Sequence, residues 1–277
     1  MGCFFFSFLL LLKTPISKCV RLCLSVVEKG RLNKRKSLWI STIPREMSIA
    51  VEISSSSGTI PTPEKSIVVA YACDVEGNFE YWSRYIEISE VLQRLPTGEL
   101  ELIADSYFVF GGDVVDRGTG DLRVLTDLVG LRRAYPDRVF FIMGNRDINK
   151  MRLPVELHES SLFVSPRVYW VKPDEDDRDF LQDPSSQVDR LKWMLTKTMG
   201  SPLAFEYRRD ELKLLNSSSS GYGDDDVVES FIDLMRPDGL MMEYLKCANI
   251  AVILGDTLFI HGGIQTYNMG WLPPMKV

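Results

Sequence analysis

The stretch that most constrains this chain lies at residues 112–118 and reads Gly-Asp-Val-Val-Asp-Arg-Gly. It follows Tyr107–Phe110, an apolar segment of the length and composition of a buried strand. The block therefore places two carboxylates, Asp113 and Asp116, and a guanidinium just beyond a strand end. Clustered carboxylates in that position are suited to bind metal cations.

Three other polar motifs also follow apolar runs: Asp74-Val75-Glu76, Gly144-Asn145-Arg146-Asp147 and His261-Gly262-Gly263. The runs at 67–72 and 139–143 are predicted to be buried strands, because they are short and rich in β-branched or aromatic residues. Strands that alternate with helices favour a parallel or mixed sheet, whose loops at the carboxyl ends of the strands meet at one edge. We expect the motifs to meet there.

Helices are predicted from Tyr81 to Leu95 and from Asp121 to Arg133, where apolar residues follow a helical spacing. Residues 150–248 show further helical patterns and are predicted to form a helical cap. Within them, the acidic run 224–226 is expected to be a solvated loop. Residues 249–254 and 257–260 are predicted to form a hairpin that delivers His261.

Composition argues against some classes of partner. The chain has 277 residues and a net charge of −6, with no basic stripe outside its first residues, so no nucleic-acid partner is expected. Of five cysteines, three lie at positions 3, 19 and 23, so no disulfide framework is implied.

The first residues have two interpretations. Residues 3–12 are apolar, but this run is shorter than the roughly 20 residues that cross a bilayer. With the basic residues that follow, residues 3–36 could make a weak contact with an anionic membrane surface. Alternatively, the protein begins at Met47. We therefore divide the chain into a leader (1–46), a Ser/Thr/Pro-rich linker (47–65) and a catalytic domain (66–277), and expect a cytoplasmic protein, with membrane association through the leader as the alternative.

Taken together, the four motifs resemble those of the calcineurin-like metallophosphoesterase superfamily, including its Ser/Thr phosphatase branch. The resemblance runs from about Ile67 to Ile264. It implies an α/β fold of the α+β type, a four-layer sandwich, here with the helical insertion at 150–248. The family has a further histidine and closing strands beyond the His-Gly-Gly motif, so the domain is expected to be truncated after Val277 and its second sheet to be incomplete.

The same resemblance implies two divalent cations, Mn, Fe, Zn or Mg, about 3.5 to 4 Å apart. Asp113 would bridge them, Asp74 and Glu76 would complete one shell, and Asn145 and His261 would belong to the other. Glu76 replaces a histidine of the family pattern, which favours harder ions such as Mn or Mg. The alternative is that Glu76 turns away to contact a helix terminus.

The remaining polar residues are assigned to catalysis. By resemblance, Arg117 binds the substrate phosphate and Asp116 orients a neighbouring group. For an isolated Asp-Arg pair, the alternative that it caps and braces the following helix would prevail. Arg146 stands where the family has the histidine taken to be the general acid, and an arginine cannot donate that proton. Arg146 could still bind phosphate, beside Arg117 and Asn145, and pair with Asp116.

The resemblance implies a phosphatase-like enzyme that hydrolyses phosphomonoesters by a hydroxide activated by two metal ions. Its substrate would be a phosphorylated protein or small molecule. The alternative is a catalytically impaired relative that binds metal or phosphate as a scaffold. A third possibility is a peripheral membrane protein whose globular part recruits partners.

Overall fold

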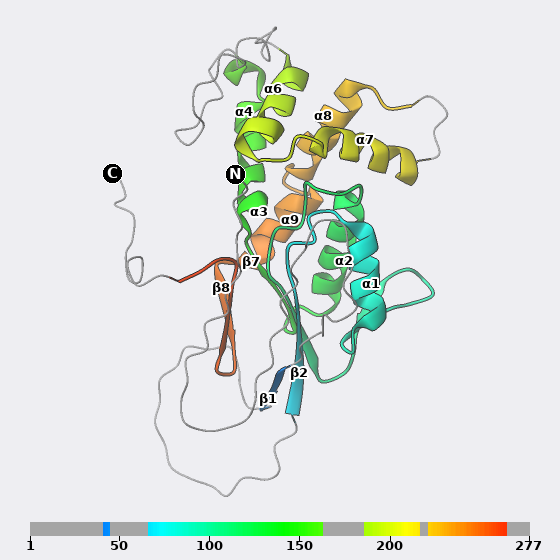
Figure 1. The fold of residues 1–277 in the computed structure, drawn as a ribbon, viewed down its shortest axis with the longest axis vertical. Helices are drawn as coiled ribbons and strands as arrows, with labels where there is room; N and C mark the ends of the chain where they lie inside the picture. The colour runs from blue at the N-terminus through cyan, green and yellow to red at the C-terminus, as the bar shows by residue number, and fades with distance from the viewer. Residues whose placement is uncertain (1–40, 45–65, 163–185, 217–220, 265–277) are drawn as a thin grey trace, which may run out of the picture.

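The computed structural model describes residues 41–44, 66–162, 186–216 and 221–264 (Figure 1). The linker at 47–65 and most of the leader lie outside these residues. In the described part of the chain, no helix has the length and apolar character needed to cross a bilayer.

A five-stranded sheet forms the centre of the molecule. Its strands, in spatial order, are β1 (Ser41–Pro44), β2 (Ser66–Ala72), β5 (Ser106–Phe110), β6 (Val139–Ile142) and β7 (Ala248–Asn249). The last four are parallel and β1 is antiparallel to β2, so the predicted mixed sheet is confirmed. Strand β1 falls inside the predicted leader, so residues 41–44 of that leader pair with β2.

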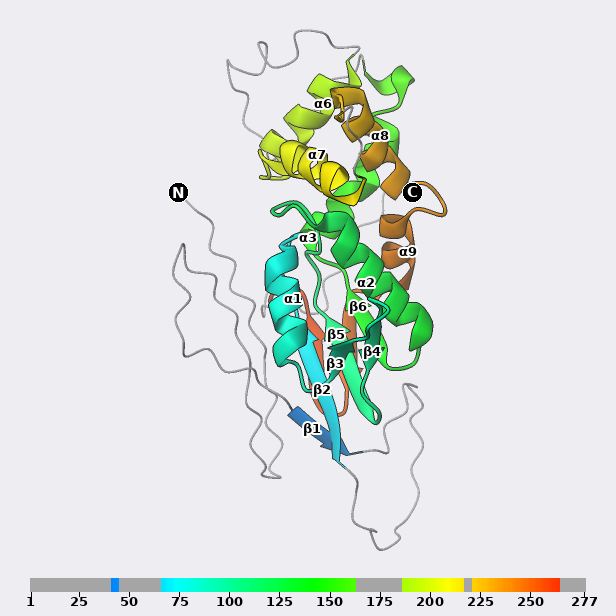
Figure 2. The same cartoon turned by 90° about the vertical axis from the view of Figure 1, so that its right-hand side faces the viewer.

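The two faces of the sheet carry different layers because side chains alternate along each strand. On one face, Ala70, Phe108 and Phe141 pack into the core formed with the helices. On the other face, Val109 and Phe140 pack against the hairpin of β8 (Ala251–Leu254) and β9 (Thr257–Ile260). Figures 1 and 2 show α1 and α2 on the first side and the hairpin on the second. The described residues thus form three layers, and the fourth layer of the expected sandwich stays a prediction.

The first helix is shorter than predicted. Helix α1 spans Phe79–Ile88, with the side chain of Asn78 accepting from the backbone N–H of Tyr81. The chain then turns at Ser89, whose hydroxyl accepts the backbone N–H groups of Val91 and Leu92. Those bonds replace the helical ones, and Leu92–Arg94 becomes β3, paired with β4 (Leu100–Leu102). The prediction of a helix up to Leu95 was therefore wrong, whereas α2 (Asp121–Ala134) confirms the second helix.

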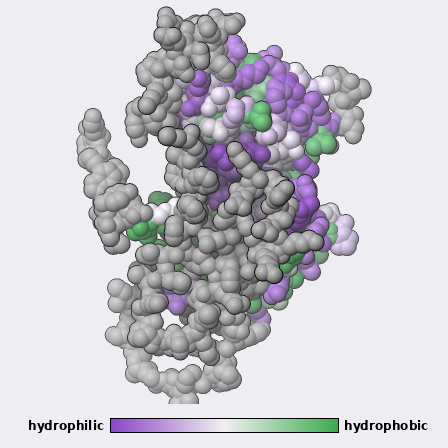
Figure 3. Space-filling view, in the orientation of Figure 1, coloured by the Kyte–Doolittle hydropathy of each residue, from purple (hydrophilic) through white to green (hydrophobic). Residues whose placement is uncertain are grey.

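The insertion is helical where it is described. After α3 (Asn145–Asn149) come the 3₁₀ helix η1 (Lys150–Arg152), α4 (Leu153–Glu156), the 3₁₀ helix η2 (Glu159–Ser161), α6 (Gln187–Trp193), the π-helix η3 (Met194–Thr198), α7 (Ala204–Leu215), α8 (Asp224–Leu234) and α9 (Leu240–Cys247). Figure 1 shows α4, α6, α7 and α8 as a cap beyond one end of the sheet, and Figure 3 shows hydrophilic residues gathered over it.

The acidic run 224–226 is not a loop, as was predicted, but the first turn of α8. Negative charge is favourable there because the backbone N–H groups of a helix N-terminus are unpaired. Asp226 accepts from the backbone N–H of Gly223, and Asp224 pairs with Lys192.

Candidate metal and active site

The predicted motifs lie at one edge of the sheet, because β2, β5 and β6 are parallel and end together. The loops after β2 and β5 are joined by backbone hydrogen bonds, from Asp74 N to Gly112 O and from Glu76 N to Asp113 O, both 3.0 Å. The loop after β6 packs as closely, since a Cβ on Gly144 would lie 2.2 Å from Asp113 Oδ1. Only glycine fits there.

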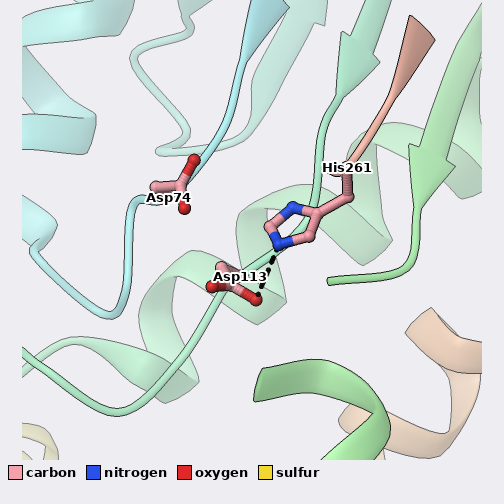
Figure 4. A group of neighbouring side chains, drawn as sticks. All are labelled: Asp74, Asp113 and His261. Carbon is pink, nitrogen blue, oxygen red and sulfur yellow. Dashed lines mark ion pairs between the residues drawn. The ribbon is translucent and has the colours of Figure 1, made fainter. Parts of the chain in front are cut away.

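Three side chains converge at this edge, from the loops after β2 and β5 and from the end of β9. One ligand atom from each of Asp74, Asp113 and His261 lies within 4.8 Å of the other two (Figure 4). Asp113 is 5% exposed and lies at the base of the group, whereas Asp74 faces solvent. Burial raises the pKa of Asp113 above its usual range, although neighbouring His261 opposes the shift.

The orientation of His261 favours a cation at this point. Its Nδ1 lies 2.8 Å from the carbonyl oxygen of Gly111, which can accept a hydrogen bond but cannot donate one. In the neutral imidazole, a proton on Nδ1 leaves a lone pair on Nε2, which lies 3.3 Å from Asn145 Oδ1 and 3.4 Å from Asp113 Oδ1. Three lone-pair donors then meet without a proton between them, and a metal ion between them would relieve their repulsion. An imidazole held by a backbone carbonyl is a common arrangement for a metal ligand.

Asp147 supports this edge from below. Its carboxylate, 0% exposed, accepts the backbone N–H groups of Asp113, Val114 and Gly144 at 2.8 to 3.0 Å. The hydroxyl of Tyr244 adds a longer bond of 3.3 Å. Burial raises the pKa of Asp147 to about 6, against the lowering effect of these N–H groups.

The backbone of the two acidic loops is strained. Four site carboxylates occupy positive φ: Asp74 at 52°, Glu76 at 50°, Asp113 at 56° and Asp116 at 102°. Positive φ in a non-glycine residue costs on the order of 1–3 kcal/mol, and such strain concentrates at functional sites. Aspartate tolerates the left-handed region better than most residues because its side chain is short and polar.

Glu76 does not join the three-residue group and is ion-paired instead. Its Oε1 lies 2.6 Å from Nε of Arg146 and 3.3 Å from Nη1 of Arg117. Burial raises the pKa of Glu76 above its usual value, although both arginines oppose the shift. Arg146 also donates from Nη1 to Ser201 Oγ at 2.6 Å and to Met199 O at 3.2 Å, and it is 7% exposed.

Asp116 and Arg117 occupy different environments. Asp116 is 1% exposed, and its Oδ2 accepts from Lys150 Nζ at 2.7 Å and lies 3.7 Å from Nη1 of Arg146. Its Oδ1 is buried with no hydrogen-bond partner among the described residues. The side chain of Arg117 is 54% exposed, so its remaining donors are open to a ligand.

The cap is tied to the motif loops through Asp121, at the start of α2. Asp121 Oδ1 accepts the backbone N–H of Asp116, and Oδ2 accepts from Arg208 of α7, both at 3.0 Å. Glu211, also from α7, accepts the backbone N–H groups of Leu122 and Arg123. The N-terminus of α2 is therefore capped by a residue of the insertion.

With this geometry in place, comparison with known proteins decides the family. The chain matches the family model of the calcineurin-like phosphoesterases over residues 74–272. The chain belongs to the calcineurin-like phosphoesterase family. Hydrolysis of phosphoesters with divalent metals is the chemistry general to such a metallophosphoesterase.

Two of the solved structures similar to this calcineurin-like phosphoesterase are phosphatases. One is a protein serine/threonine phosphatase from Saccharomyces cerevisiae, with 20% identity, 29% of this chain and 22% of that chain covered, and a TM-score of 0.24. Another is a cold-active protein-tyrosine phosphatase of a psychrophilic Shewanella species, with 16% identity, 84% and 60% covered, and a TM-score of 0.39. The chain thus spans less than two thirds of the length of either.

Of the residues predicted for this phosphoesterase, the structure brings Asp74, Asp113, Asn145 and His261 together and places Glu76 with the arginines. Sequence reasoning missed Lys150 and gave no role to Asp147. Lys150 could have been found, because it lies four residues after Arg146 and consecutive helical turns bring such residues together. Ser201 and Arg208 carried no local signal, since only the folded cap brings them near.

Proposed function

We propose that this protein hydrolyses phosphomonoesters at the edge formed by Asp74, Asp113, Asn145 and His261. These residues would hold a divalent cation. The observation that carries the proposal is the convergence of carboxylate, amide and imidazole lone pairs around Asp113. Oxygen donors with one imidazole suit Mn, Fe, Zn or Mg. Bound there, such a metal supplies Lewis acidity toward the phosphoryl group and lowers the pKa of water.

The chain's own residues would position the substrate. Arg117 would bind phosphate oxygens through its exposed donors, a task for which a planar guanidinium is suited. Asn145, exposed beside His261, could donate from its amide nitrogen to the same phosphate. Asp116 holds Lys150 and Arg146 in place. The phosphate-binding role expected for Arg146 stays a prediction, because its guanidinium is bonded to Glu76, Met199 and Ser201.

A second candidate function is a scaffold that binds metal or phosphate without turnover. Arg146 favours it, because it stands where the resemblance implies a general acid and a guanidinium keeps its proton at neutral pH. A leaving alcohol would then depart without a proton from this side chain. If the protein is instead the proposed hydrolase, substrates with good leaving groups, such as aryl phosphates, would be hydrolysed best.

The test is release of phosphate from an aryl phosphate with and without added Mn²⁺. The wild type should require metal, and Asp113→Asn should lower the rate by at least about 100-fold, the loss typical of removing one transition-state stabilising group. His158→Ala is the matched control, since this histidine is exposed at a helix end away from the edge. Equal rates for wild type and Asp113→Asn would refute the proposal, and metal binding without turnover would support the scaffold.

A further inference from the structure

We infer that this site holds one divalent cation rather than two, and that the guanidinium of Arg146 supplies positive charge at the place where a second cation would need Glu76. The inference builds on the proposed metal binding at Asp113, but it concerns stoichiometry. Counting bound ions tests it without reference to hydrolysis.

The ligand expected for a second ion is already engaged. Glu76 Oε1 lies 2.6 Å from Arg146 Nε, the distance of a charge-assisted hydrogen bond, and Arg117 approaches the same carboxylate at 3.3 Å. A cation bound by Glu76 would have to compete with a guanidinium already at bonding distance. The described ligand atoms that do gather belong to Asp74, Asp113 and His261.

Arg146 cannot easily move away. Its side chain is 8% exposed, and its Nη1 donates to Ser201 Oγ and Met199 O, both supplied by the cap. Its backbone N–H donates to Asp113 Oδ1 at 2.9 Å, and its Nε lies 3.6 Å from Asp113 Oδ2. Displacing the guanidinium would leave Glu76 and these buried acceptors without their partner, which is strongly unfavourable.

The charges at this edge fit one divalent ion better than two. Five carboxylates and three cationic side chains gather there: Asp74, Glu76, Asp113, Asp116 and Asp147 with Arg117, Arg146 and Lys150. Two net negative charges remain, which one divalent ion balances. A second ion would add two more positive charges within a few ångströms of Arg146, where repulsion in a partly buried site is strong.

The decisive experiment counts Mn²⁺ ions bound to the full chain by isothermal titration calorimetry. The wild type should bind one ion, and Arg146→Met should bind two, because Glu76 is released as a ligand. Arg117→Met is the control: it removes the other arginine on the same carboxylate, but an exposed one, and should leave the count at one. Circular dichroism checks that each variant is folded.

A charge-matched double variant separates ligand loss from charge. Glu76→Gln with Arg146→Met removes one negative and one positive charge, so the count should return to one. The dissociation constant of that ion should change by less than about tenfold, the smallest loss typical of removing a group that supports a metal site. A larger loss would identify Glu76 as a ligand of the first ion and overturn the inference.

Electron paramagnetic resonance of the wild type gives an independent result if Arg146→Met does not fold. At saturating Mn²⁺ we expect the spectrum of an isolated ion, whereas two ions bridged by Asp113 would give a spin-coupled spectrum. Two ions in the wild type, or one ion in folded Arg146→Met, would overturn this inference and leave the proposed hydrolysis standing. One bound ion without phosphate release would support this inference and overturn the proposed hydrolysis. The absence of any bound ion would overturn both the inference and the proposed hydrolysis.

Discussion

The open edge and the layer beneath it use the same kind of side chain, a carboxylate, for opposite purposes. At the edge, Asp74 and Asn145 are exposed, and their lone-pair atoms lie with that of His261 around Asp113. Beneath them, Asp147 is fully buried and accepts three backbone N–H groups. The edge has too little positive charge to balance its carboxylates, whereas the carboxylate beneath it accepts nearly as many hydrogen bonds as it can. A carboxylate after a strand is therefore left open to a ligand or used as a brace according to what packs against it.

The cap contributes to that difference. Ser201 binds Arg146, and Arg208 binds Asp121, which in turn holds the backbone of Asp116. Both cap residues are buried and come from outside the four motifs. The motif loops would thus bind metal in a setting that the insertion has fixed.

The largest effect is expected from removing Asp147, the carboxylate that braces the edge from below. Asp147→Ala leaves three buried backbone N–H groups without an acceptor, and each loss costs about 1–3 kcal/mol. We expect the free energy of unfolding, measured by urea denaturation, to fall by about 4 kcal/mol. Asp225→Ala removes an exposed aspartate of α8 as the control, and an equal loss in both variants would contradict the bracing role.

The next effect concerns the link to the cap. Arg208→Met leaves the buried carboxylate of Asp121 without its cation, and breaking a buried ion pair in this way costs about 3–5 kcal/mol. Because Asp121 can protonate, we expect a loss near the lower value in urea unfolding at pH 7. Arg209→Met removes the neighbouring arginine, which makes ion pairs nearer the surface, and should cost less than about 1 kcal/mol. Similar losses for the two would show that the link adds no stability.

At the open edge, ligand loss should affect metal binding more than folding. His261→Ala should raise the dissociation constant of Mn²⁺ by at least about 100-fold, since losing a group that merely supports a ligand already costs about 10- to 100-fold. Calorimetric titration measures the change. The unfolding free energy without metal should stay closer to wild type than that of Asp147→Ala. An unchanged affinity would remove His261 from the ligand set.

The smallest effect is a pH dependence. Burial raises the pKa of Asp121 to about 6 against a usual 3.8, although Arg208 opposes the shift. Between these values the folded state holds a proton that the unfolded state has released, so acid favours folding through this group. Relative to Asp121→Asn, the wild type should gain about 2 kcal/mol of unfolding free energy as the pH falls from 7 to about 4. Parallel pH profiles for the two proteins would contradict the shift.

The sequence predicted the edge better than the inner layer. Apolar runs followed by Asp74, Asp113 and Asn145 located the strand ends, and parallel strands bring their carboxyl ends together by geometry alone. The partner of Glu76 could not be foreseen, because it depends on Ser201 and Met199 fixing Arg146 from about fifty residues away.

Local chemistry explains the other failures. The apolar spacing from Tyr81 to Leu95 indicated one helix, but the hydroxyl of Ser89 accepts the next backbone N–H groups and ends it. The run 224–226 indicated a solvated loop, but Asp226 caps a helix. In both cases the hydrogen bonds accepted by one side chain outweigh the average tendency of the segment.

The most direct test of this account is a crystal structure with Mn²⁺, with the ion located by its anomalous scattering. The account predicts an anomalous peak at bonding distance from Asp74, Asp113 and His261, with the Glu76 to Arg146 ion pair intact. A peak bound by Glu76, or none near Asp113, would contradict it.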